Sequence, residues 1–504
     1  MHHVKGQQRN QIQMICLDQV VAQDSFVRLI DMFVDAIDLE SFKIKHVTTK
    51  EEGRPPYHPA TLLKLYLYGY RYGVRSSRKL EHQTWVNLEV RWLLNEQTPS
   101  NRTIAAFRKE NKGAFRDIFR KFVYLLKQAE LIDGETIAID SFKVRGQNSL
   151  KNNYNNKKIA RHLEYIENTI TEYEQALDAA DTQEEKEEIE KKLAIQNNRK
   201  EKYQAISQQL EESGQEQIST TDSDARAVIL HRGVVNVGYN IQAAVDAKNK
   251  LITDFETGDV NDTRALAAVA ISTKELLGLE AMNVLADKGY HTGDQLARCA
   301  AANIVTYVSP KESASNDDDI YPISRFVYNA ENDVYICPAG ETLSTNGTWH
   351  GHSTKGKTVA FRFQRYNTAA CKGCAKREKC TKSKVNGRNI DRSEFATVIE
   401  QNNQRVNENP NYYRQRQQLA EHPWGTLKRQ RGFDHVLTRG KDQVLGEVSL
   451  VFIGYNLGRC AQILKSHDAF KALLERHIAL FLRQNKPILS PFGPLCWQNQ
   501  KRAA

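Results

Sequence analysis

The sequence predicts an α/β protein in which a mixed β-sheet is joined to an all-helical N-terminal domain. Three observations predict this class. The pattern is helical throughout residues 57–131, a β-rich run begins at 135–140, and further short β-rich runs alternate with amphipathic helices as far as residue 310. At 504 residues the chain exceeds one ordinary core, so several modules are expected.

The charge balance favours a polyanionic partner. Lys and Arg total 71 against 61 Asp and Glu, a formal net charge of +10. The start of the chain is polar and has no secretory signal pattern. The apolar segment 444–458 is interrupted by Glu447 and Asn456 and is shorter than the ~20 residues of a membrane span, so we expect a core helix there. We therefore expect a cytoplasmic protein with no membrane partner.

The N-terminal region carries two basic segments. Residues 66–79 interleave four tyrosines with arginines, a mixture that can place cations on phosphates and rings on sugars or bases. Residues 98–111 are typical of a turn, a capping Ser100 or Asn101 and a short basic helix, as in helix-turn-helix elements. DNA contact is weighed against a helical bundle with a solvated basic face. The candidate DNA-binding residues here are Arg71, Arg75, Arg102 and Arg108.

The chain changes character at residue 135. The run 135–140 predicts a strand that ends at Asp140. Residues 155–215 then predict an inserted antiparallel helical hairpin, with Thr182 and Glu185 as a capping box at its turn. Its expected role is structural or dimerising.

The following segment predicts the rest of a sheet. Residues 237–258 predict two antiparallel strands, and 261–278 a helix capped by Asn261 or Asp262. A strand closing on Asp287, a helix and a strand at 304–310 follow. This order of elements matches a ribonuclease-H-like core, a mixed sheet with helices on its faces.

Four cysteines cluster in the Gly-rich region after residue 311. Two of them form a Cys-x2-Cys arm, and the set supplies the four thiols that close a tetrahedral zinc site. Structural zinc is weighed against reduced, unligated thiols. The four residues are Cys337, Cys371, Cys374 and Cys380.

These patterns divide the chain into seven segments. They are a helical N-terminal domain at 1–132 that we expect to bind DNA, a first segment of the expected α/β core at 133–154, the hairpin at 155–215, a second core segment at 216–310, the Cys-rich β segment at 311–393, a third core segment at 394–467 and a basic tail at 468–504.

Three acids are candidate catalytic and metal-binding residues. Two Mg²⁺ ions ~3.5–4 Å apart can activate a nucleophile and stabilise a leaving oxygen, and they need hard carboxylate ligands on rigid elements. Asp140 and Asp287 end strands, and Glu421 lies in a helix. Taken singly, each acid is better explained as a turn, cap or surface residue.

The resemblance of the chain to a known family brings these acids together. Matching segments occur in one order along most of the chain: YHPATLLKLYLYGY (57–70), ETIAIDSFKVRG (135–146), STTDSDAR (219–226), GYNIQAAVD (238–246), VLADKGYHTGDQL (284–296), CKGCAKREKC (371–380) and EHPWGTLKRQRGF (421–433). The chain resembles DDE-type insertion-sequence transposases of the branch with a Tyr-Arg-Glu-Lys signature, most closely the group named eleven-eighty-two.

The resemblance implies roles for individual residues. The first and second Asp of the family fall on Asp140 and Asp287, and its Glu falls on Glu421, which would hold two Mg²⁺ or Mn²⁺ ions. Lys428 follows Glu421 at the signature spacing and is expected to contact DNA. The DNA-binding residues Tyr413 and Arg416 precede Glu421 with one residue more than the signature allows, which rotates their helix face by about 100°. Glu447 is a fallback for the third acid.

The resemblance also implies an activity. It implies an enzyme that binds terminal inverted repeats, cleaves DNA with magnesium, joins the ends to target DNA, acts as a homodimer or larger assembly, and associates with the nucleoid. Three alternatives are a nuclease of the same fold without joining activity, a non-catalytic DNA-binding descendant, and a zinc-dependent adaptor.

Overall fold

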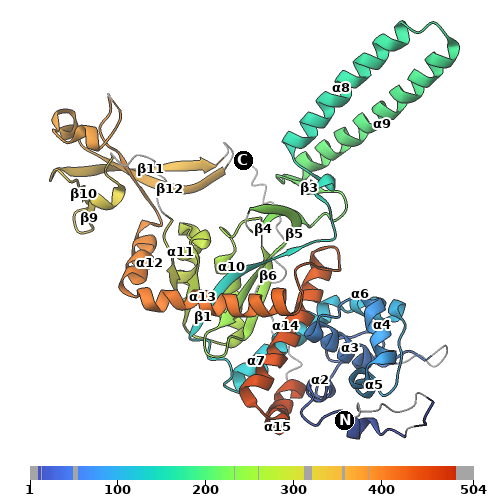
Figure 1. Cartoon of the computed structure of the whole chain (residues 1–504). Helices are drawn as coiled ribbons and strands as arrows, with labels where there is room; N and C mark the ends of the chain where they lie inside the picture. Colours follow the sequence, from blue (N-terminus) through green and yellow to red (C-terminus); the bar gives the residue numbers. More distant parts are fainter. Residues whose placement is uncertain are drawn as a thin grey trace, which may run out of the picture. The chain divides into compact units, whose positions relative to one another are not determined.

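The computed structural model describes residues 10–483 except 13, 49–54, 232, 259, 312–319, 355–357 and 384. The chain forms two compact units (Figure 1). Unit 1 contains Met1–Asp133, Ser141–Asn261 and Glu421–Ala504, and unit 2 contains Gly134–Asp140 and Asp262–Ala420. Within the described ranges, none of the helices is long and apolar enough to cross a bilayer.

Unit 1 begins with the predicted helical region. Helix α7 buries an aromatic face that includes Phe115, Phe119 and Phe122, which is the spacing of one helix face. Helix α6 starts where the sequence predicts, because the side chain of Ser100 accepts a hydrogen bond from the Thr103 N–H. The helices are α1 (Leu17–Val20), α2 (Phe26–Asp35), α3 (Pro59–Tyr72), α4 (Ser77–Val86), α5 (Leu88–Leu93), α6 (Asn101–Glu110) and α7 (Lys112–Gln128).

The main sheet has six strands in the order β4-β5-β1-β7-β8, with β6 paired to β5. In unit 2, β1 pairs with β7 and β7 with β8 in parallel. In unit 1, β4, β5 and β6 are antiparallel. The chain is therefore mixed α/β, as predicted. The strands are β1 (Thr136–Arg145), β4 (Arg226–His231), β5 (Val234–Asp246), β6 (Ile252–Gly258), β7 (Met282–Ala286) and β8 (Ile304–Val308).

Two details of the sheet differ from the prediction. Strand β1 continues to Arg145, so Asp140 lies in the middle of a strand and not at its end. The alternation of buried residues persists through Phe142 and Val144, which the predicted strand did not include. Strand β4 was not predicted, although residues 226–231 have a β-rich composition.

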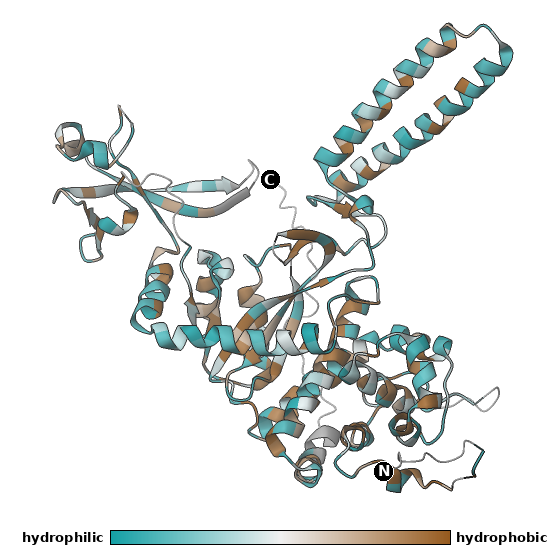
Figure 2. Cartoon of the chain, in the orientation of Figure 1, coloured by the Kyte–Doolittle hydropathy of each residue, from teal (hydrophilic) through white to brown (hydrophobic). Residues whose placement is uncertain are grey.

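The residues after Tyr154 form a pair of long helices. Helix α8 (Asn156–Asp178) packs on α9 (Gln183–Ser213), and the predicted capping box of Thr182 and Glu185 is present. Figures 1 and 2 show two side-by-side helices with mostly hydrophilic surfaces. Buried Ile159, Ile166, Ile206 and Leu210 hold the pair. The helical turn η1 (Leu150–Asn152) precedes a short ladder between β2 (Asn153–Tyr154) and β3 (Ile218–Ser219).

Helix α10 of unit 2 corrects another prediction. It begins at Leu266 after an Ala265 cap, so Asn261 and Asp262 do not cap it. The carbonyl oxygen of Asp262 instead accepts from the Ala265 N–H in a separate turn. The elements of this region are α10 (Leu266–Leu277), the 3-10 turn η2 (Lys288–Tyr290), α11 (Gly293–Ala301), α12 (Ala396–Glu408) and α13 (Pro410–Gly425).

The Cys-rich segment forms a second, five-stranded sheet with the order β13-β12-β11-β10-β9. Its small core is built from Phe326, Tyr335, Leu343, Tyr366 and Ile390. The elements are η3 (Ile323–Arg325), β9 (Val327–Asn329), β10 (Val334–Ile336), β11 (Thr342–Thr354), β12 (Thr358–Asn367), η4 (Ala369–Gly373), η5 (Arg377–Lys379) and β13 (Ile390–Ser393).

The chain returns to unit 1 for its last helices. The π-helical segment η6 (Thr426–Gln430) leads to α14 (Lys441–Leu464), and α15 (His467–Arg483) follows. Helix α14 is buried along nearly its whole length, which confirms the predicted core helix. Residues 484–504 of the predicted basic tail lie outside the described residues.

Candidate functional site

Two candidate acids lie at corresponding positions on neighbouring parallel strands. Ile139 of β1 pairs with Ala286 of β7, so Asp140 in β1 and Asp287 directly after β7 come next along the two chains. Asp287 then turns the chain into η2, because its Oδ1 accepts a 2.5 Å hydrogen bond from the Gly289 N–H. The sheet register therefore brings together the two acids that the sequence singled out.

A third acid of unit 2, Asp262, lies beside them. A Cβ atom built on Gly289 would stand 2.9 Å from Oδ1 of Asp287 and 3.6 Å from Oδ2 of Asp262. The two carboxylates therefore lie against the same glycine. Sequence reasoning assigned Asp262 to a helix cap and missed this position, although the residue closely follows the end of strand β6 and so had a strand-end signal of its own.

The pKa of Tyr290 reflects the combined charge of these three acids. Its side chain is fully buried. Burial and the charges of Asp262, Asp140 and Asp287 raise the pKa of Tyr290 well above its usual value, while Arg416 acts in the opposite direction. All five groups belong to unit 2. The hydroxyl stays protonated at neutral pH, so it can donate a hydrogen bond within an acidic cluster.

Helix α13 carries the predicted Tyr-Arg-Glu residues. Arg416 acts on Tyr290, and Glu421 lies five residues later on the same helix with an exposed side chain. Tyr413 is partly buried. Lys428 lies in η6, and its Nζ stands 4.8 Å from the ring centre of Phe142. The DNA contact predicted for Lys428 stays a prediction.

The predicted DNA-binding role of the tyrosine-rich helix needs correction. Tyr66, Tyr68 and Tyr70 are buried and cannot stack on bases. Arg108 donates to the Tyr70 hydroxyl at 3.1 Å inside the unit. The spacing of apolar residues in the sequence did not reveal this burial, because α3 packs against other helices, α2 and α14 among them, on two sides.

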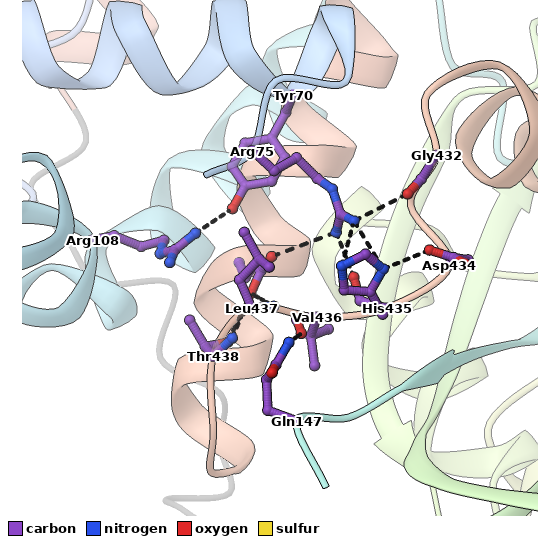
Figure 3. Close-up of polar contacts among 11 residues, drawn as sticks. Tyr70, Arg75, Arg108, Gln147, Gly432, Asp434, His435, Val436, Leu437 and Thr438 are labelled. Atoms are coloured by element: carbon purple, nitrogen blue, oxygen red, sulfur yellow. Dashed lines mark hydrogen bonds and ion pairs between the residues drawn. The ribbon is translucent and has the colours of Figure 1, made fainter. Parts of the chain in front are cut away.

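Two of the other predicted arginines also serve internal contacts. Arg75 is 8% exposed and donates to the carbonyl oxygens of Gly432 and His435 (Figure 3). The guanidinium of Arg71 packs 4.9 Å from the ring centre of Phe26. Arg102 is exposed on α6 and remains a predicted DNA contact.

Glu447 does not serve as a reserve third acid. It is fully buried in α14, and its Oε2 accepts hydrogen bonds from the N–H groups of Leu437 and Thr438 and from the Thr438 hydroxyl. Its Oε1 lies 4.0 Å from Nη1 of Arg75. This carboxylate anchors the preceding loop.

The four clustered thiols face one small cavity, about 20 Å³ in volume. Burial and the charges of Cys374, Cys337 and Cys371 raise the pKa of the Cys380 thiol, as expected for sulfurs that lie close together. All four are free thiols.

Two matching turns aim backbone donors at sulfur. The Ala339 N–H donates to Cys337 Sγ, and the Lys376 N–H donates to Cys374 Sγ, each at 3.4 Å. Each cysteine carbonyl also accepts from the N–H three residues later, at Gly340 and Arg377. Cys337 and Cys374 are therefore held by the same kind of backbone turn.

Among the residues that the structure describes, no group of three or more His, Cys, Asp or Glu side chains is arranged to hold a metal ion as it stands. The donor types nevertheless match two different cations. The Asp140, Asp262 and Asp287 oxygens suit a hard ion such as Mg²⁺, and the four sulfurs suit zinc.

Comparison with known families gives two matches. Residues 15–110 match a family described as a transposase domain (DUF772). Residues 336–461 match a family described as a transposase DDE domain. The matches support a DDE-type transposase.

The matched ranges place the transposase domains on the fold. The first covers helices α1 to α6, and the second runs from the Cys-rich sheet through α12 and α13, with Glu421, into α14. Asp140, Asp262 and Asp287 lie between the two matched ranges. No curated protein and no solved structure gives a significant match to this chain.

Proposed function

We propose that this protein is a DNA transposase that binds the terminal inverted repeats of its element, cleaves their 3′ strand ends and joins them to target DNA. The observation that carries the proposal is the convergence of Asp140, Asp262 and Asp287 around Tyr290 in unit 2. Acids from separate strands are suited to binding divalent cations at a phosphodiester.

We assign the metal ligands as Asp140, Asp287 and Glu421. Two Mg²⁺ or Mn²⁺ ions would supply charge neutralisation at the scissile phosphate when bound. The cluster provides the carboxylate oxygens that such ions prefer. Glu421 is assigned from the family resemblance and from its place on the helix of Arg416, within the matched DDE domain.

Two residues outside that triad position the carboxylates. The protonated Tyr290 hydroxyl and the Arg416 guanidinium counter the mutual repulsion of the acids, which would otherwise drive their side chains apart. Asp262 adds a further negative charge and keeps the cluster acidic enough to attract a divalent cation. These residues work from within unit 2.

The test is a cleavage and strand-transfer assay with DNA that carries the inverted repeats flanking the coding sequence. Asp140→Asn, Asp262→Asn, Asp287→Asn and Glu421→Gln are expected to lower cleavage by at least about 100-fold. Glu280→Gln removes an exposed carboxylate of unit 2 and serves as the control.

The same assay separates the alternatives. Cleavage without joined product would identify a nuclease, and binding without cleavage by the wild-type protein would identify a non-catalytic DNA-binding protein. Full activity of Asp287→Asn would refute the assignment.

We propose also that Cys337, Cys371, Cys374 and Cys380 bind a structural zinc ion. The support is their shared cavity and the two matching turns with N–H donors on sulfur. To reach the ~2.3 Å zinc–sulfur bond length, the four sulfurs would draw together into the small cavity. Four thiolates complete the coordination shell, so the ion has no position left for catalysis.

Zinc content tests this second proposal directly. Purified protein is expected to contain one zinc ion per chain, and Cys374→Ser to contain none and to melt at a lower temperature. Cys16→Ser, at an exposed free cysteine, is the control. Wild-type protein without zinc after purification in zinc-supplemented medium would contradict the assignment.

The partners follow from these assignments. Double-stranded DNA is the substrate, and we propose a homodimer or larger assembly on DNA because two element ends must be joined together. Arg102 on α6 is the predicted DNA contact of the first transposase domain that the structure leaves exposed.

A further inference from the structure

A polar cavity lies within unit 1, where β1 ends. Its volume is about 560 Å³. The polar side chains that line it, beside the apolar Leu150, are Arg145, Gln147, Asn148, Ser149, Asn236 and His435. They are separate from the acidic cluster, and the proposed chemistry gives them no role.

Backbone hydrogen bonds fix one wall of this cavity. The Arg145 N–H donates to the carbonyl oxygen of Asp434 at 3.0 Å, and the Val436 N–H donates back to the carbonyl oxygen of Arg145 at 2.8 Å. The side chain of Gln147 donates to the carbonyl oxygen of Val436 at 2.9 Å (Figure 3). Residues 145–147 and 434–436 therefore form a paired, preorganised edge.

A buried cation supports this wall from behind. Figure 3 shows Arg75 reaching from the N-terminal helices to Gly432 and His435. Its Nη2 lies 3.1 Å from both ring nitrogens of His435 and 3.1 Å from the carbonyl oxygen of Gly432. Glu447 holds the next residues of the loop through Leu437 and Thr438. The imidazole is thus held at the cavity edge by buried groups.

The lining is rich in hydrogen-bond donors. Arg145 supplies a guanidinium, Gln147, Asn148 and Asn236 supply amides, and Ser149 supplies a hydroxyl. Among the described residues, no carboxylate lines the cavity. This composition suits a ligand with anionic oxygens and further acceptors, such as the phosphates and sugars of a nucleic-acid strand.

The carboxylate of Asp434, beside the cavity, forms a long ion pair with Arg145. Oδ2 of Asp434 lies 3.9 Å from Nη2 of Arg145, and Oδ1 lies 2.6 Å from Nδ1 of His435. The Arg145 side chain is 47% exposed, so this long ion pair is weak. A phosphate oxygen can replace Asp434 as its partner at little cost.

We propose that this cavity binds the sugar-phosphate backbone of the DNA strand, with Arg145 as the phosphate contact. The assignment rests on the proposed function, since it names where the transposase holds its substrate. The cavity makes neutral and charged contacts from one rigid edge, so it fixes the position of a strand without reading its sequence.

The test measures the affinity of the full-length protein for a fluorescein-labelled DNA duplex by anisotropy over a range of salt concentrations. Arg145→Ala is expected to weaken binding by about ten-fold at low salt and to lower the salt slope by about one unit. Lys192→Ala is the matched control, because Lys192 is 48% exposed and pairs with Glu188 on α9. It should leave both quantities unchanged.

Two further measurements test whether Asp434 competes with DNA for Arg145 and whether the cavity binds DNA or a free phosphate ion. Asp434→Asn is expected to tighten DNA binding, because it removes the competing carboxylate. Inorganic phosphate at constant ionic strength should not displace the duplex; displacement that depends on Arg145 would indicate a free-anion site and overturn the DNA assignment. Equal affinity and salt slope for Arg145→Ala and wild type would also overturn it.

This outcome is separable from that of the proposed function. Arg145-dependent binding by a protein that never cleaves DNA would uphold the cavity and refute the transposase activity. If Asp287→Asn abolishes cleavage while Arg145→Ala binds DNA as the wild type does, the transposase activity would be upheld and the cavity assignment refuted.

Discussion

The N–H of Gly289 donates to Oδ1 of Asp287 at 2.5 Å, and the same glycine leaves space for the carboxylate of Asp262. The backbone N–H thus orients the carboxylate of Asp287, and the lack of a side chain at Gly289 leaves room for the carboxylate of Asp262. The two acids meet there although 24 residues, from 263 to 286, separate them in the sequence.

This relationship predicts that Gly289→Ala impairs DNA cleavage. The added Cβ would stand 2.9 Å from Oδ1 of Asp287, closer than ordinary contacts allow, so the carboxylate has to move. We expect cleavage to fall by at least about ten-fold, with a small change in melting temperature. Gly113→Ala, where a Cβ meets no atom within 4 Å, is the control. Unchanged cleavage would show that this position of Asp287 is not needed.

Glu447→Ala is predicted to act on stability. The substitution removes the acceptor of three hydrogen bonds from Leu437 and Thr438, and it takes away the carboxylate that lies 4.0 Å from Arg75. The free energy of unfolding should fall by about 3 kcal/mol, measured by urea denaturation. Glu447→Gln, which keeps one acceptor oxygen, should lose less. Loss of cleavage at full stability would instead return Glu447 to the metal site.

Stability should also decrease at mildly acidic pH because of His422. Burial and the charges of Arg459 and Lys250 lower the pKa of His422 below 6.5. The unfolded chain therefore binds this proton at a higher pH than the folded chain, so unfolding becomes easier as pH falls through about 6.5. His422→Gln should flatten the pH dependence of the unfolding free energy between about pH 5 and 7. An unchanged slope would exclude His422 as its source.

Arg431→Met is predicted to stabilise the protein. Arg431 is 7% exposed, and its Nε and Nη1 have no hydrogen-bond partner among the described residues. Burial and the charge of Arg71 lower the pKa of Arg431 to about 10. Replacing this charge with an apolar side chain of similar length should raise the unfolding free energy by about 1 kcal/mol. A lower melting temperature would mean that the guanidinium has a partner in solution.

The sequence was most informative where a pattern reflects the backbone directly. The strands before Asp140 and Asp287, the cap at Ser100 and the capping box of Thr182 and Glu185 follow from local rules. Periodicity and capping depend only on neighbouring residues, so they can be recognised without the fold.

Tertiary burial was not predictable in the same way. Arg75 and Arg108 look like surface cations in a basic segment, yet long-range contacts with His435 and Tyr70 take them inside. Asp262 resembled a helix cap because it precedes an amphipathic helix in the sequence. Its proximity to Gly289 becomes visible only in the three-dimensional structure. The assignment of Glu421 as a metal ligand and the role of Lys428 remain predictions.

The parallel pairing of β1 with β7 sets an order of events during synthesis on the ribosome. Ile139 cannot find its partner Ala286 until the intervening chain, with the whole of α8 and α9, has been made. The two helices can form early from local contacts, whereas the first half of β1 has to wait. Prematurely terminated products that stop before β7 would lack Asp287 and leave Asp140 on an unpaired strand half, so the proposed acidic site could not form in them.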